Sequence, residues 1–223
     1  MLLKKDETIV FAGDSVTDAG KIPPYGIADS LGQGLGEGYV HFIHDMLAAT
    51  YPEMNLHIVN SGIGGDTSQT LLERWQKDVL NFKPEWISIC IGINDSICKF
   101  LYPKRSDFEN SYEKYAERLD YMAKSAKDIS AGVLMVSPYV AEPWKEDMFR
   151  RDMDVYRKIC KETAEKYSCK YVDIQDMFDE YFKIRHQCCI AWDRIHPNRI
   201  GAYMIAKEIL KALEFNNDHI IAK

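Results

Sequence analysis

The chain alternates short apolar runs with longer segments of helical periodicity, and this alternation restricts the fold more than any other feature. Each run is rich in β-branched or aromatic residues and almost entirely apolar, which is typical of parallel strands buried on both faces. The predicted strands are Glu7–Gly13, Asn55–Gly62, Glu85–Gly92, Gly132–Pro138 and Cys169–Ile174. Strands that alternate with helices predict an α/β fold, a three-layer sandwich with right-handed crossovers.

The helical segments each show one apolar face. The longest stripe steps by four and three residues through Phe108, Tyr112, Tyr115, Leu119, Met122, Ala126 and Ile129. A second stripe surrounds Trp75, and Thr70 with Glu73 three residues later predicts a capping box at its start. The last helix is expected over residues 200–213, where Asn198 is positioned to cap it.

Length and composition favour one domain spanning residues 1–223. A chain of 223 residues can bury roughly 70% of its unfolded surface, so it needs no disulfide or metal to form a core. No repeat, low-complexity tract or Gly/Ser-rich linker divides it. The net charge of −6 and the lack of a dense basic stripe argue against a nucleic-acid partner.

The N-terminal sequence MLLKKDETIVFAGDS has only a short apolar run before a Gly-Asp turn, so we interpret it as a first strand and not as a secretory signal. No apolar stretch approaches the roughly 20 residues of a membrane span. The six cysteines show no zinc-type spacing, so we expect reduced thiols in a cytoplasmic protein. Nothing in the sequence distinguishes a monomer from a homodimer.

Polar residues gather directly after the first three predicted strands. GDSVTD with Ser15 follows the first, NSGIGGDT with Gly65 the second, and GINDS with Asn94 the third. Ligand sites of open parallel sheets lie beyond the carboxyl ends of the strands, so these loops predict one site. Each residue also has a structural interpretation. Gly-Asp-Ser is ordinary turn chemistry, Gly65 permits a left-handed backbone, and Asn94 can cap its own turn.

The segment WDRIHPNRIG, Trp192 to Gly201, places Asp193 three residues before His196. Pro197 disfavours helical torsions at His196, and Asp193 can accept a hydrogen bond from one ring nitrogen. That bond fixes the tautomer and leaves the other nitrogen as a general base for a serine. One aspartate and one histidine are too few ligands for a metal ion, so no metal site is predicted.

Together these blocks resemble the SGNH hydrolases, the group that contains the GDSL-type lipases and esterases. The family is named for a serine, a glycine, an asparagine and a histidine in separate blocks. The residues that match, in that order, are Ser15, Gly65, Asn94 and His196. The matching blocks span residues 11–201. Val16 stands where lipolytic members often have leucine, which weakens the lipase label more than the chemistry.

The resemblance implies a flavodoxin-like, five-stranded parallel sheet of order 2-1-3-4-5. It implies that Ser15 attacks an ester carbonyl, with His196 as base and then acid, and with Asp193 orienting the histidine. The backbone N–H groups of Ser15 and Gly65 and the side chain of Asn94 would form the oxyanion hole. No metal or organic cofactor is expected.

The expected function is hydrolysis of a small-molecule carboxylic ester, with a short acyl group such as acetyl on a carbohydrate or another small polar molecule. Alternatives with the same machinery are a lipase or lysophospholipase, a thioesterase and an acyltransferase. A non-catalytic binding module is an alternative of a different class, although no triad member is missing. GIGGDT lacks the ending of a P-loop and the spacing of a dinucleotide fingerprint, which argues against nucleotide binding.

Specificity is expected to reside in two loops, Gly20–Gly38 and Ala141–Met153. The candidate substrate contacts are Asp14, next to the candidate nucleophile, and Trp144 in the second loop.

Overall fold

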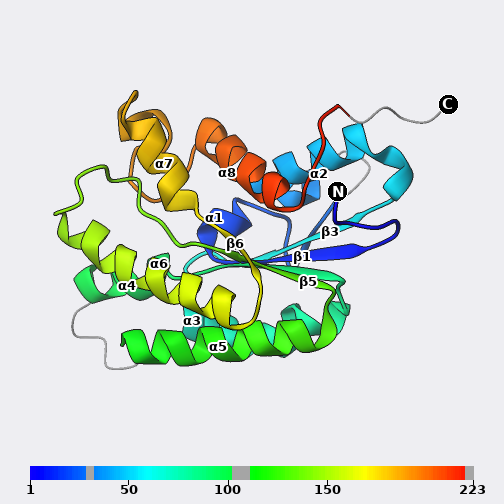
Figure 1. The fold of residues 1–223 in the computed structure, drawn as a ribbon, viewed down its shortest axis with the longest axis horizontal. Helices are drawn as coiled ribbons and strands as arrows, with labels where there is room; N and C mark the ends of the chain where they lie inside the picture. Colours follow the sequence, from blue (N-terminus) through cyan, green and yellow to red (C-terminus); the bar gives the residue numbers. More distant parts are fainter. Residues whose placement is uncertain (29–32, 102–110, 219–223) are drawn as a thin grey trace.

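A single sheet lies between two layers of helices in the computed structural model, which describes residues 1–28, 33–101 and 111–218 (Figure 1). The strands are β1 (Thr8–Gly13), β2 (Gly26–Ile27), β3 (His57–Gly62), β4 (Trp86–Cys90), β5 (Gly132–Val136) and β6 (Lys170–Val172). They are arranged in the order β2-β3-β1-β4-β5-β6, and every neighbouring pair is parallel except β2 with β3. The five predicted strands therefore lie in the order 2-1-3-4-5, as expected.

The sheet contains six strands instead of five, so the expectation of a purely parallel five-stranded sheet was wrong at one edge. The added strand, β2, runs antiparallel to β3 and pairs Gly26 with Asn60 and Ile27 with Val59. A strand of two residues has too little periodicity to be distinguished from a loop. β2 lies inside the predicted loop Gly20–Gly38, where the prolines and the glycine of IPPYGI (residues 22–27) are typical of turns.

Helices cover both faces of the sheet (Figure 1). They are α1 (Ser15–Asp18), α2 (Tyr39–Thr50), α3 (Ser68–Asp78), α4 (Ile93–Leu101), α5 (Tyr112–Ile129), α6 (Met148–Lys166), α7 (Ile174–Phe182) and α8 (Arg199–Ala212). Short 3₁₀ helices lie at Gln33–Leu35, Pro52–Met54, Leu80–Phe82 and Gln187–Cys189. α2, α7 and α8 pack on one face, and α3, α5 and α6 pack on the other.

Two hydrophobic cores result, one on each face, because successive side chains of a strand point to opposite sides. In β4, Trp86 and Cys90 belong to the core under α2 and α8, whereas Ile87 and Ile89 belong to the core over α3 and α5. All four side chains are buried, in agreement with strands covered on both faces.

The predicted capping box lies one helical turn earlier than expected. α3 begins at Ser68, and its N-cap is Thr67 instead of Thr70. The Thr67 hydroxyl accepts from the Thr70 N–H at 3.3 Å, and the Thr70 hydroxyl accepts from the Thr67 N–H at 2.9 Å. The prediction with Glu73 was wrong because this box uses a threonine where the usual pattern has Glu or Gln. Asn198 caps α8 as predicted, accepting from Ile200 and Gly201 N–H groups.

The long predicted stripe is the buried face of α5, where Tyr115, Leu119, Met122 and Ala126 are at most 1% exposed. Ile129, at the helix end, is 49% exposed, and Phe108 lies outside the described residues. Among the helices described, none is both long enough and apolar enough to cross a membrane.

Candidate active site

Ser15 lies at the sharp turn between β1 and α1, at the carboxyl edge of the sheet. The preceding Asp14 caps α1, because its Oδ1 accepts a 3.0 Å hydrogen bond from the Val16 N–H. The turn requires glycine at Gly13, where an added Cβ would come within 2.2 Å of Thr17 Oγ1. Among the described residues, the backbone N–H of Ser15 has no acceptor and is available to a ligand.

Hydrogen bonds join Ser15, His196 and Asp193 in series. Ser15 Oγ lies 2.8 Å from His196 Nε2, although the two residues are 181 positions apart. His196 Nδ1 lies 2.6 Å from Asp193 Oδ2. A carboxylate can only accept, so we assign the proton to Nδ1, which leaves Nε2 free to accept the serine proton.

The carboxylate of Asp193 is held by its own loop. Its Oδ1 accepts from the N–H groups of Ile195 and His196 at 2.9 and 2.8 Å. Partial burial by itself raises the pKa of Asp193, but the hydrogen bonds from the His196 ring and from these two N–H groups outweigh it and hold the pKa below its ordinary value. The charged form, which stabilises a protonated imidazole, is therefore favoured.

The loop after β3 brings Gly65 to the Ser15 turn. The Gly64 N–H donates to Asp18 Oδ2 on α1 at 2.9 Å, and the Ile63 N–H donates to the Gly13 carbonyl at 3.0 Å. Gly65 has a φ of +85°, so the left-handed interpretation of this glycine is confirmed. Its N–H makes no hydrogen bond in the part of the chain that the structure describes.

Asn94 lies in the first turn of α4 and joins the third loop to the second. One of its side-chain N–H groups donates to the Asp66 carbonyl at 2.8 Å. The other N–H of the amide has no partner among the described residues. Ser15, Gly65 and Asn94 thus offer unpartnered donors from three loops, which is what an oxyanion hole requires.

Arg74 of α3 links these loops through hydrogen bonds, a role that the sequence did not reveal. Its Nε donates to Asp66 Oδ2 at 2.7 Å, its Nη1 to Ser61 Oγ at 3.0 Å, and its Nη2 to the Gly13 carbonyl at 3.2 Å. Burial raises the pKa of Asp66, and the charge of Arg74 opposes this effect. No linear pattern links an arginine within a helix to a turn 61 residues earlier.

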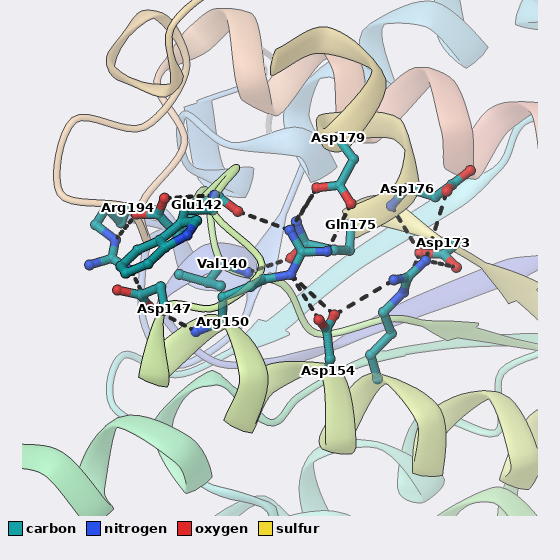
Figure 2. Close-up of polar contacts among 12 residues, drawn as sticks. Val140, Glu142, Asp147, Arg150, Asp154, Asp173, Gln175, Asp176, Asp179 and Arg194 are labelled. Carbon is teal, nitrogen blue, oxygen red and sulfur yellow. Dashed lines mark hydrogen bonds and ion pairs between the residues drawn. The ribbon is translucent and has the colours of Figure 1, made fainter. Parts of the chain in front are cut away.

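Arg194 anchors the loop that carries the candidate acid and base (Figure 2). Its Nη2 donates to Asp147 Oδ1 at 2.7 Å, and its Nε forms an ion pair with Glu142 Oε2 at 3.1 Å. Its carbonyl accepts from the Ala141 N–H at 2.8 Å. The Tyr139 hydroxyl donates to the carbonyl of the next residue, Ile195, at 3.0 Å. The position of Arg194 inside the Asp-x-x-His spacing was the available signal for this role.

A buried arginine continues this network toward α7 (Figure 2). Arg150 is 1% exposed, donates to both oxygens of Asp179 at 2.7 and 2.8 Å, and contacts Asp154 at 3.1 Å. It also donates to the Glu142 carbonyl at 2.9 Å. Burial by itself raises the pKa of Asp179, but the hydrogen bonds from Arg150 and Gln175 outweigh it, and the pKa is lowered. Arg150 therefore fixes the segment to which the Arg194 loop is bound.

Both candidate substrate contacts remain predictions. Asp14 is 2% exposed and is already used as the cap of α1. Burial, with smaller contributions from the charges of Asp95 and Asp66, raises its pKa to about 7. Trp144 is 64% exposed in the loop before α6. Across the described ranges, no group of three His, Cys, Asp or Glu side chains is arranged to hold a metal ion.

A serine hydroxyl aligned with an imidazole and a carboxylate is suited to attack on an acyl carbon, and donors from separate loops suit the oxyanion that forms. The fold and this arrangement are those of a carboxylic ester hydrolase of the SGNH type. Residues 11–203 match the GDSL-like Lipase/Acylhydrolase family, and the chain belongs to that family.

Two curated relatives extend over nearly the whole chain. The chain is 35% identical over 215 residues to an acetylxylan esterase of Geobacillus stearothermophilus, which covers 96% of this chain and 97% of the relative. It is 26% identical over 218 residues to a probable rhamnogalacturonan acetylesterase, YesY, of Bacillus subtilis (strain 168), with 92% of each chain covered.

Solved structures show the same architecture. The crystal structure of the Geobacillus stearothermophilus acetylxylan esterase Axe2 superposes with a TM-score of 0.93 at 34% identity, covering 97% of this chain and 98% of that one. LAE5, an alpha/beta hydrolase from the metagenome of Lake Arreo, Spain, gives a TM-score of 0.91 at 37% identity, with 96% and 98% covered. Structures of Axe2 also include catalytic mutants in which a serine, an aspartate or a histidine is replaced by alanine.

Proposed function

We propose that this chain is a serine acetylesterase that removes acetyl groups from a carbohydrate through Ser15, His196 and Asp193. The observation that carries the proposal is the 2.8 Å contact between Ser15 Oγ and His196 Nε2, with the 2.6 Å contact behind it to Asp193. The acetylxylan esterase that resembles the chain over 96% of its length supports acetyl as the acyl group and xylan-type sugar as the alcohol.

The proposed reaction follows from the geometry. Ser15 Oγ attacks the acetyl carbonyl carbon while its proton moves to His196 Nε2, and Asp193 stabilises the imidazolium. The N–H groups of Ser15, Gly65 and Asn94 hold the negative oxygen, and each such donor typically lowers the barrier by about 3–4 kcal/mol. His196 then protonates the sugar oxygen as the carbon–oxygen bond breaks. Water, activated by the same nitrogen, hydrolyses the acetyl-serine and restores the enzyme.

The first test is hydrolysis of p-nitrophenyl esters of increasing acyl length, and of acetylated methyl xyloside, by wild type and Ser15→Ala. We expect the fastest hydrolysis with acetyl and a loss of roughly 10⁴-fold or more in kcat for Ser15→Ala, with an unchanged circular dichroism spectrum. Ser130→Ala, at the end of α5, is the matched control and should keep full activity. Equal activity of wild type and Ser15→Ala would exclude Ser15 as the nucleophile, and a preference for long acyl chains would exclude an acetylesterase.

A further inference from the structure

Two adjoining cavities lead away from Ser15 along the start of α8. The nearer one, of about 360 Å³, is lined by Ser15 and His196. The farther one, of about 430 Å³, is lined by Ile22, His41 and Phe42, among others. Glu37 and Arg199 line both cavities, so the two form one continuous depression, which we call the α8 groove.

The nucleophile and the general acid determine which part of an ester the groove receives. In acyl transfer, the leaving oxygen must lie within hydrogen-bond reach of the protonated histidine. The nearer cavity has His196 in its wall and neither of the other oxyanion donors, Gly65 and Asn94. The nearer cavity therefore receives the alcohol part of the ester. The farther cavity receives the continuation of that alcohol, away from Ser15.

The charges at the junction of the cavities favour a neutral, hydroxyl-rich ligand. Glu37 and Arg199 are exposed, and neither forms an ion pair or a side-chain hydrogen bond in the described part of the chain. The Arg199 guanidinium lies 5.6 Å from the ring centroid of Phe42. One acceptor and one donor of opposite charge suit hydroxyl groups, which both donate and accept, better than they suit an anion.

Helix stability does not explain Arg199. It is the first residue of α8, and no acidic side chain lies in the first turn of that helix. A cation at this position is unfavourable, because the helix dipole is positive at the N-terminus. The Phe42 ring is a local contact for the Arg199 guanidinium, but it leaves the N–H donors of the guanidinium available to a ligand.

We propose that the α8 groove binds the sugar chain that carries the acetyl ester. The acetylated sugar occupies the nearer cavity, a neighbouring sugar occupies the farther one, and Glu37 and Arg199 hydrogen-bond hydroxyl groups between them. Cavities of these volumes lie within the range of small-molecule sites. This inference rests on the proposed function. It assigns recognition of substrate length to the α8 groove.

The test compares kcat/KM for acetylated methyl xyloside with kcat/KM for acetylated xylotriose. Wild type should favour the longer substrate, and Glu37→Ala and Arg199→Ala should each reduce this preference by about tenfold, mainly through KM, because each removes a hydrogen bond to a charged group. Lys211→Ala, on the same helix about 18 Å further along, is the matched control and should keep the wild-type preference.

Direct binding gives a second measurement that needs no turnover. Calorimetry with unacetylated xylotriose should show binding to Ser15→Ala and about tenfold weaker binding when Arg199→Ala is added. The inference would be overturned, and the proposed function kept, if wild type hydrolysed both acetylated sugars with equal kcat/KM. The same would follow if the variants kept the wild-type preference for acetylated xylotriose. Failure of wild type to release acetate from either sugar would overturn the proposed function and the inference with it.

Discussion

Asp14 is an unusual titratable residue, because a carboxyl group next to the candidate nucleophile is almost completely buried. Burial raises its pKa from the ordinary 3.8 to about 7, and the Val16 N–H only partly opposes this rise. Between about pH 4 and pH 7 the folded chain therefore keeps a proton that the unfolded chain has lost. The Asp14 contribution to stability is most favourable below pH 4, decreases as pH rises and levels off above about pH 7.

We predict that Asp14→Asn removes this pH dependence. Asparagine mimics the protonated carboxyl group and can still accept the hydrogen bond from Val16, but it does not titrate. The free energy of unfolding of wild type, measured in urea from pH 4 to pH 8, should fall relative to that of the variant by at most about 1.4 kcal/mol per pH unit. Asp128→Asn, at an exposed helix position, should run parallel to wild type. If the free energies of unfolding of wild type and Asp14→Asn changed equally with pH, Asp14 would already be ionised in the folded chain.

Some residues of the site could be predicted from the sequence, and others could not. Ser15 and His196 were predictable because each follows from a short local pattern, a turn after a strand and an acid-x-x-His-Pro block. Their 2.8 Å contact was not derivable from either pattern, since it depends on the whole fold. Arg74 was unpredictable for the same reason, because its partners lie on three separate segments.

At the level of elements, the loop that carries Asp193 and His196 is held by the segment before α6. Arg194 is the link, through Asp147 and Glu142, and both carboxylates lie in largely buried positions. Arg194 has a φ of +72°, so the loop makes a left-handed turn between the acid and the base. The Ala141 N–H and the Tyr139 hydroxyl hold the backbone of this turn, and the Arg194 side chain adds the charged contacts that fix it against the segment before α6.

We predict that Arg194→Ala lowers kcat by about 10²-fold with little change in KM, since misplacing a catalytic group by about 1 Å has an effect of this size. Arg194→Lys should recover part of the loss by restoring the charge. The control is Arg157→Ala, which removes a comparable arginine–carboxylate pair between α6 and Asp173, at 2.9 and 2.7 Å, away from the Asp193–His196 loop. If Arg157→Ala lost as much kcat as Arg194→Ala, the effect would be one of general stability and not of positioning.

The elements themselves were predicted where periodicity extended over several residues. β1 and β3 to β6 match predicted runs. β4 and β5 are buried on both faces, which leaves continuous apolar sequence, whereas in the edge strand β6 only Val172 is buried. β2 was missed, because only its pairing with β3 defines it. The start of α3 was displaced by one turn, since a threonine pair forms its capping box without any acidic residue.

At the level of the whole molecule, the sheet separates two hydrophobic cores that never meet. Each core has its own set of helices, so the cooperativity of the chain depends on the strands that both cores share. The chain is expected to be a single domain. A buried thiol in each of the two cores provides a test of this expectation. Cys90 of β4 belongs to one core and Cys160 of α6 to the other.

We predict that both thiols lose protection at the same denaturant concentration. Burial raises the pKa of each thiol, so the reactive thiolate is scarce and inaccessible while the chain is folded. Brief labelling with N-ethylmaleimide across a urea series, followed by peptide mass analysis, should give one midpoint for Cys90 and Cys160. The exposed Cys188 should react without urea and serves as the internal control. One midpoint is expected because a single cooperative domain loses the packing on both faces of its sheet together. Two separate midpoints would show instead that one layer opens while the other stays folded.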